Sequence, residues 1–191
     1  MDSIFKHTEN NGEAIITGLQ RALTETSIFI PETINGIPVV EIGPEAFRST
    51  SITDIKIGEN IKKIGEKAFY MCEKLQSVTW HCQCDVIPVD CFSGCSNLTQ
   101  FDFSNIKRIG AHAFENSGLT SVRLSKETAV DQSGFACCND LEKIEWLSGR
   151  SIEGDIFEEC QNIKEIIISD NVMGIAVDAF ASSPNAEISF I

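Results

Sequence analysis

Phenylalanine recurs along this chain at an almost constant interval. Seven phenylalanines stand 22, 23, 22, 21, 22 and 23 residues apart, namely Phe47, Phe69, Phe92, Phe114, Phe135, Phe157 and Phe180. A small residue precedes most of them, and a run of the form Leu-x-x-apolar-x-apolar follows. A fixed period of this length indicates units that bury their apolar side only by stacking on their neighbours. The spacing therefore predicts a right-handed solenoid of about seven units over residues 31–191.

The apolar run after each phenylalanine predicts a short strand. Apolar and polar residues alternate there, as expected for half-buried strands. The inward pairs are Ile55 and Ile57, Val78 and Trp80, Phe101 and Phe103, Val122 and Leu124, Ile144 and Trp146, Ile166 and Ile168, and Ile188 and Phe190. Strands stacked at the repeat interval form a parallel sheet with a spacing of about 4.8 Å. Period and strand pattern together indicate leucine-rich repeats.

The repeat unit resembles the BspA-type leucine-rich repeats of bacterial and protozoan surface antigens. Ile61-x-x-Ile64-Gly65-x-x-Ala68-Phe69-x-x-Cys72 resembles the consensus unit, and residues 30–47 resemble the opening unit. The resemblance covers about residues 28–191. It departs in two ways, since the usual Ile-Pro after each strand is mostly replaced and the last three units lose the Ile-Gly pair wholly or in part. The resemblance implies an adhesin-like or surface-antigen-like domain that binds host, extracellular-matrix or other proteins.

The two ends of the chain differ from the repeats. Residues 1–30 are expected to cap the first repeat, because Asn10-Asn11-Gly12 between two apolar runs favours a tight hairpin turn. At the other end the chain stops at Phe190-Ile191, within the expected last strand. Terminal repeats normally need a polar cap. We therefore expect either that the chain is a piece of a longer protein or that this edge pairs with another molecule.

Composition excludes several classes of function. The formal net charge is -13, from 28 acidic and 15 basic residues, which argues against nucleic-acid binding because that requires clustered Lys and Arg. No stretch reaches the roughly 18 consecutive apolar residues of a membrane span, and no signal peptide is visible. This leaves localisation open, with the cell surface expected for a fragment of a family-like antigen and the cytoplasm for a full-length chain. No cofactor is expected.

The eight cysteines mostly follow the repeat register. Cys72, Cys95, Cys138 and Cys160 each come three residues after a repeat phenylalanine, and Cys91 takes the place of a small residue. Side chains that share one column point the same way, which suits packing better than cross-linking. We expect these thiols to be buried, reduced and unligated. His81, Cys82 and Cys84 lie outside the register, in a loop that lacks a second pair of metal ligands nearby.

One column imitates a catalytic triad. Two residues before each phenylalanine the chain carries Glu45, Lys67, Asp90, His112, Ser133, Asp155 and Asp178. An Asp, a His and a Ser thus occupy successive turns, but equivalent positions on stacked turns project in parallel and form no pocket. A nucleophile needs a base in contact, an orienting group and an oxyanion site. The sequence therefore predicts no catalytic residues and no enzyme.

The outward side of the predicted sheet is the remaining candidate site. Its polar positions alternate in charge from turn to turn, and its C-terminal half also carries outward apolar residues. The predicted partner-binding residues are Asp102, Arg123, Lys143, Glu145, Leu147, Glu165 and Ile167. Two interpretations stay open: a protein-binding module that uses this face, and a structural spacer without a ligand of its own. The apolar positions could also be covered by a following repeat.

Overall fold

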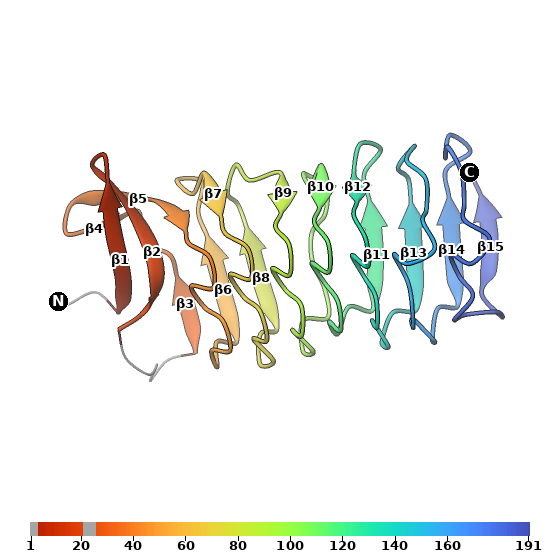
Figure 1. Cartoon of the computed structure of the whole chain (residues 1–191), viewed down its shortest axis with the longest axis horizontal. Coiled ribbons are helices and arrows are strands. Elements are labelled where there is room, and N and C mark those ends of the chain that lie inside the picture. Colours follow the sequence, from red (N-terminus) through yellow and green to blue (C-terminus); the bar gives the residue numbers. More distant parts are fainter. Residues whose placement is uncertain (1–3, 21–25) are drawn as a thin grey trace.

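The chain folds into an elongated solenoid of strands and turns (Figure 1). The computed structural model describes residues 4–20 and 26–191, and within these ranges it contains β-strands and no helix. The predicted leucine-rich-repeat solenoid is confirmed, with about eight turns rather than seven. The additional rung is β3 (Ser27–Phe29), which pairs with the next turn although no repeat phenylalanine precedes it at the usual interval.

The long-strand face consists of two parallel sheets. The first contains β3, β6 (Asp54–Ile57) and β8 (Ser77–Trp80). The second contains β11 (Ser121–Leu124), β13 (Lys143–Trp146), β14 (Glu165–Ile168) and β15 (Glu187–Phe190). Its register places Arg123 beside Glu145, and Glu145 beside Ile167. Within the second sheet, the register expected from the sequence is therefore the observed one.

The short-strand side carries pieces of sheet that lead into each phenylalanine. β5 (Ile37–Ile42) pairs in parallel with β7 (Lys63–Ile64). β9 (Val86–Ile87), β10 (Arg108–Ile109) and β12 (Ala129–Val130) form a separate parallel sheet. No ladder joins β7 to β9 in the described residues, although they belong to consecutive turns.

A hairpin covers the first turn, as predicted. β1 (Phe5–Asn10) and β2 (Glu13–Leu19) are antiparallel and joined by Asn11 and Gly12, whose φ angles of 51° and 77° suit a tight turn. β2 continues the solenoid by pairing in parallel with β5, and β4 (Thr33–Ile34) pairs antiparallel with β5. Residues 1–3 and 21–25 of the expected cap lie outside the described residues.

The phenylalanines stack in one column along the third side, called here the Phe side. Ring centroids of successive residues from Phe47 to Phe180 lie 5.2–5.8 Å apart. The first six are fully buried, whereas Phe180 is only half-buried because no further turn of this chain covers it. The expected column is therefore confirmed, but its last ring is not part of the core proper.

A second column contains four of the eight cysteines. Each thiol three residues after a repeat phenylalanine donates to the carbonyl of the phenylalanine one turn earlier. The four contacts are Cys72 to Phe47 at 2.9 Å, Cys95 to Phe69 at 3.2 Å, Cys138 to Phe114 at 3.1 Å and Cys160 to Phe135 at 3.1 Å. Thr50, Ser117 and Ser183 hold the same position in other turns. Small hydrogen-bond donors therefore occupy this column. All eight cysteines are free thiols.

Candidate functional site

Charged side chains form a zigzag on the long-strand face of the C-terminal half. Arg123 lies 2.7 Å from Glu145, while Lys143 lies 3.7 Å from Glu145 and 2.9 Å from Glu165. The pairs join neighbouring strands at the predicted positions. Exposed pairs of this kind contribute about 0–1 kcal/mol each to stability, and their carboxylates and cations remain at the surface.

The predicted apolar residues of this face are less exposed than the sequence suggested. Leu147 follows β13 and Ile167 lies within β14, and both are half-buried. Ile191, beyond β15, is 65% exposed. The structure thus brings Leu147 and Ile167 next to the charged zigzag through the register of β13 and β14.

Asp102 does not join this cluster. Its carboxylate accepts a 2.9 Å hydrogen bond from the backbone N–H of Ser104. In other turns the N–H at the equivalent position, such as that of His81 or Ser169, bonds to a strand carbonyl of the preceding turn. Residues 99–103 accordingly form no strand, and the strand expected at Phe101 and Phe103 is absent.

Phe29 is a surface residue that the sequence interpretation missed. It lies in β3 beside Lys56 in the outward column, is 55% exposed, and has the Lys56 ammonium 5.7 Å from its ring centroid. A shallow hollow of about 290 Å³ adjoins it. The available signal was the apolar run Ile28-Phe29-Ile30, which the assignment of residues 1–30 to a cap concealed.

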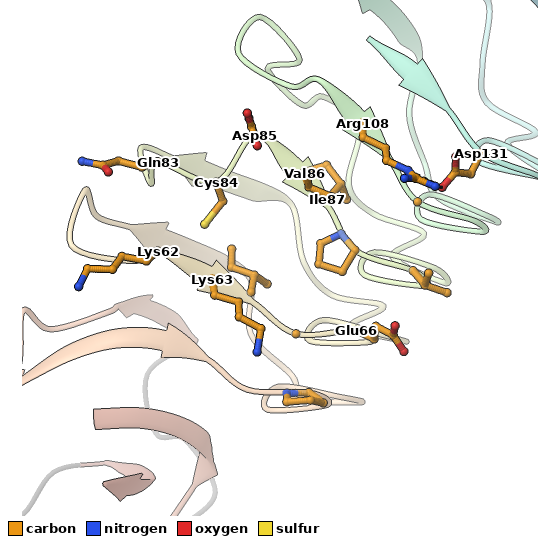
Figure 2. Close-up of a pocket in the computed structure, with 16 residues that line it drawn as sticks. Lys62, Lys63, Glu66, Gln83, Cys84, Asp85, Val86, Ile87, Arg108 and Asp131 are labelled. Carbon is orange, nitrogen blue, oxygen red and sulfur yellow. Dashed lines mark hydrogen bonds and ion pairs between the residues drawn. The ribbon is translucent and has the colours of Figure 1, made fainter. Parts of the chain in front are cut away.

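The solenoid is open on two sides between the turn that contains Phe69 and the turn that contains Phe92. This boundary is called here the split level. On the short-strand side a cavity of about 670 Å³ lies between β7 and β9 (Figure 2). On the long-strand face a hollow of about 400 Å³ lies between β8 and residues 99–102. The Phe side stays closed, since Phe69 N–H donates to the Cys91 carbonyl at 3.0 Å and Met71 N–H to Ser93 at 2.8 Å.

Aromatic side chains fill the interior at the split level. Trp80 packs 5.7 Å from Phe101 and 6.0 Å from Phe92, and Phe101 lies 5.0 Å from Phe103. The Trp80 indole N–H donates to the Cys84 carbonyl at 2.9 Å. Bulky rings thus occupy three inward positions of these two turns and pack against one another.

His81, Cys82 and Cys84 form the loop between β8 and β9. A hydrogen bond from Cys84 lowers the pKa of the Cys82 thiol, and the same contact together with burial raises the pKa of Cys84. Figure 2 shows the Cys84 side chain directed toward the cavity. The described residues contain no group of three or more His, Cys, Asp or Glu arranged to hold a metal ion.

The triad-like column has a backbone explanation. Glu45, Lys67, Asp90, His112 and Ser133 all have φ angles of 53–58°, in the left-handed region. Polar residues such as Asp and His tolerate this region better than bulky apolar ones. Asp90 lies 3.8 Å from Lys67, and His112 Nδ1 lies 3.0 Å from Glu115. The column therefore reflects a repeated turn, in which Asp90 and His112 each face a charged neighbour rather than one another.

Stacked parallel rungs, a phenylalanine column and short leading strands define a leucine-rich-repeat solenoid. The sequence matches the BspA type leucine rich repeat region, in six copies, over residues 24–142 and 128–191. The chain belongs to this family. No curated protein matches the sequence. No helix in the described ranges is long and apolar enough to cross a membrane.

Three solved structures of bacterial leucine-rich repeat proteins share this fold. A leucine-rich repeat protein from Bacteroides ovatus has a TM-score of 0.77 at 25% identity, over 96% of this chain and 54% of that protein. One from Eubacterium ventriosum has a TM-score of 0.54 at 21% identity, over 93% and 50%. The Treponema pallidum leucine-rich repeat protein has a TM-score of 0.51 at 17% identity, over 92% and 82%. The chain thus spans about half the length of the first and second of these.

Proposed function

We propose that this chain is a non-enzymatic protein-binding module, adhesin-like or surface-antigen-like, which uses the long-strand face of its C-terminal half. The observation that carries the proposal is the charged zigzag of Arg123, Lys143, Glu145 and Glu165 beside the half-buried Leu147 and Ile167. An apolar centre with a polar rim is the usual make-up of a protein interface. Leucine-rich repeats generally mediate protein–protein contacts through such extended surfaces.

The absence of catalysis in this proposal is supported by the geometry of the polar columns. Asp90, His112 and Ser133 lie on successive turns, and Asp90 and His112 face partners on the Phe side. The family and the similar structures are leucine-rich repeat proteins, a class that is generally not enzymatic. A protein partner, from a host or an extracellular matrix, is the ligand class that this arrangement favours.

One observation favours a structural spacer instead. The cations of the zigzag, Arg123 and Lys143, already pair with carboxylates of neighbouring strands. Such pairs stabilise a sheet without any ligand. A spacer would carry its face unoccupied and would present a neighbouring domain.

The test compares one face variant with a control. Leu147→Ser, Ile167→Ser, Arg123→Glu and Lys143→Glu are combined, and Arg48→Glu with Lys74→Glu changes two exposed cations outside the face. Both proteins and the wild type are measured by surface plasmon resonance against a panel of purified extracellular-matrix proteins and by capture from a host-cell lysate. We expect the face variant to lose a partner that the control retains, with a nearly unchanged melting temperature. A partner that binds all three equally contradicts the face assignment, and no partner at all supports the spacer.

A further inference from the structure

Beside the cavity between β7 and β9, proline replaces a residue that makes a recurring hydrogen bond in other turns. In five turns the backbone N–H four residues before the repeat phenylalanine donates to a carbonyl of the preceding turn. Four of these bonds are Gly43 to Ile16 at 2.7 Å and Gly65 to Ile42, Gly110 to Ile87 and Asp131 to Ile109 at 2.8 Å each. The turn of Phe92 carries Pro88 at this position, and proline has no N–H to donate to Ile64.

Pro88 also prevents close approach. A Cβ built on Gly65 would lie 2.3 Å from the Pro44 backbone nitrogen, and one on Gly110 would lie 2.8 Å from that of Val89. At these turns only the missing side chain lets the two backbones pack closely. The pyrrolidine ring of Pro88 stands where those glycines carry hydrogen. It therefore acts as a wedge, and the gap of about 670 Å³ lies beside it.

The gap is bounded by two strand edges. Among the described strands, β7 pairs only with β5, and β9 pairs only with β10, so each turns an unpaired edge toward the cavity. Strand edges bond readily to another polypeptide backbone. Because the Phe side remains bonded at this level, the gap is a slot closed at one end rather than a break through the molecule.

The slot offers apolar contacts and no free cation among its lining residues. Ile64, Val86 and Pro88 line it, and Val86 is 44% exposed. The cations at its rim are each bound to a carboxylate: Lys62 to Glu13 at 2.8 Å, Lys63 to Glu41 at 2.7 Å and Arg108 to Asp131 at 2.9 Å. Figure 2 shows Lys62 and Lys63 directed away from Val86. A free anion would have to displace these partners, whereas a peptide backbone would not.

We propose that this slot binds an extended segment of a protein partner by strand addition, with its backbone against the edges of β7 and β9 and an apolar side chain on Ile64 and Val86. The inference rests on the proposed function as a protein-binding module and assigns it a second surface, on a different side from the charged zigzag. A cavity of this size accommodates a few peptide residues. An extended backbone supplies the donors and acceptors that the two edges lack.

The probe is a synthetic library of nine-residue peptides with alternating apolar and polar residues, screened against the whole chain. Selected peptides are resynthesised with alternate amide nitrogens methylated, which removes the N–H donors of one edge. We expect methylation to weaken binding about tenfold or more, equivalent to about 1.4 kcal/mol. Equal binding of the methylated peptides, or no peptide that binds above background, would overturn the proposal.

Two variants test the slot itself. Pro88→Gly restores the residue found in three other turns, so the ladder should close. We expect loss of peptide binding, and protection of the new amide at residue 88 from hydrogen exchange as strong as that of Gly65 and Gly110. Pro184→Gly, at an exposed position elsewhere, should leave peptide binding unchanged. Val86→Asp should weaken peptide binding about tenfold with an unchanged circular dichroism spectrum. If Pro88→Gly does not fold, the result for Val86→Asp alone tests whether the peptide binds in the slot. Unaltered binding in the folded variants contradicts the proposal.

The combined variant of the long-strand face distinguishes binding by that face from binding in the slot. The combined change at Leu147, Ile167, Arg123 and Lys143 should leave peptide binding in the slot intact. Conversely, a partner that depends on the long-strand face but not on Pro88 or Val86 would support the proposed function and refute the slot.

Discussion

At the scale of single residues, each phenylalanine is stabilised by its two neighbours in the stack. Phe114 lies 5.3 Å from Phe92 and 5.6 Å from Phe135 and is fully buried, whereas Phe180 has only Phe157 at 5.8 Å. Truncating a ring inside the stack removes contacts on both sides and leaves a cavity. Truncating the last ring leaves an opening that solvent fills.

We therefore expect Phe114→Ala to lower the free energy of unfolding by about 3–5 kcal/mol, and Phe180→Ala by about 1–2 kcal/mol because its burial is partial. Urea denaturation followed by circular dichroism measures both. Equal losses for the two variants would contradict the difference in burial that the structure describes.

The left-handed residues also belong to this scale. Besides the five residues two before the phenylalanine, a second group lies two after it, comprising Ser49, Met71, Asn116, Cys137 and Glu159, with Gly94 at the same position. The five repeats from Phe47 to Phe135 therefore bend twice around their phenylalanine. This double bend is the physical source of the column that imitated a triad. A sequence period alone could not distinguish a backbone requirement from a chemical one.

At the scale of elements, the thiol column links one turn to the next. Burial raises the pKa of Cys95 and of Cys72, with the neighbouring thiol charge adding to the effect at Cys95. At low pH the thiol is protonated in both the folded and the unfolded chain, so its raised pKa in the folded chain does not change the free energy of unfolding. Above the ordinary value of 9.0, the unfolded chain loses a proton that the folded chain keeps, so stability falls as pH rises.

Cys95→Ser provides the test, because Ser117 and Ser183 hold the same column position with a hydroxyl. We expect the wild type to lose about 1.4 kcal/mol per pH unit more than the variant above pH 9.0. Urea titrations at several alkaline pH values measure the difference, and the constant cost of the substitution cancels. Parallel pH profiles would show that this thiol ionises as easily in the folded chain as in the unfolded one.

Most elements could be predicted because the period fixes the columns. The strands at Val122, Ile144 and Ile166 and their register follow directly from the alternation. The rung at β3 was not predicted because it lacks the phenylalanine that marked the others. The missing strand at residues 99–103 depends on whether Ser104 bonds to Asp102 or to a backbone carbonyl, two options close in energy.

The two candidate sites also differ in whether the sequence predicted them. The zigzag of Arg123, Lys143 and Glu145 was predicted, because neighbouring rungs place equivalent positions side by side. Which face binds a partner stays a prediction. The slot was not predicted, although Pro88 stands where Gly43, Gly65 and Gly110 stand in other turns. That difference is readable in the sequence, but its effect required knowing which N–H bonds hold the turns together.

At the scale of the whole molecule, the split level separates two blocks of turns. Each block has its own tryptophan: Trp80 is half-buried beside the split, and Trp146 is fully buried in β13. Repeat proteins unfold through their weakest neighbour-to-neighbour interface. Ladder hydrogen bonds are missing on two sides at this level. Each missing bond lowers the stability of the interface between the blocks by about 1 kcal/mol.

Single-tryptophan variants, Trp80→Phe and Trp146→Phe, report each block by fluorescence. We expect their urea midpoints to differ, because the blocks unfold partly independently. Pro88→Gly should bring the midpoints together by restoring a ladder bond. Coincident midpoints in both backgrounds would mean that the aromatic cluster around Trp80 couples the blocks fully.

The one-sided closure of the split level has a mechanical consequence. Under a pull along the long axis, the other turns share the load over two or three bonded sides, while the turns of Phe69 and Phe92 share it chiefly along the Phe side. The molecule then yields there first and bends like a hinge, with the strand edges of β7 and β9 moving apart. Tension on the two ends thereby changes the shape of the molecule at the split level. A peptide segment bound between β7 and β9 would be pulled on by the same motion.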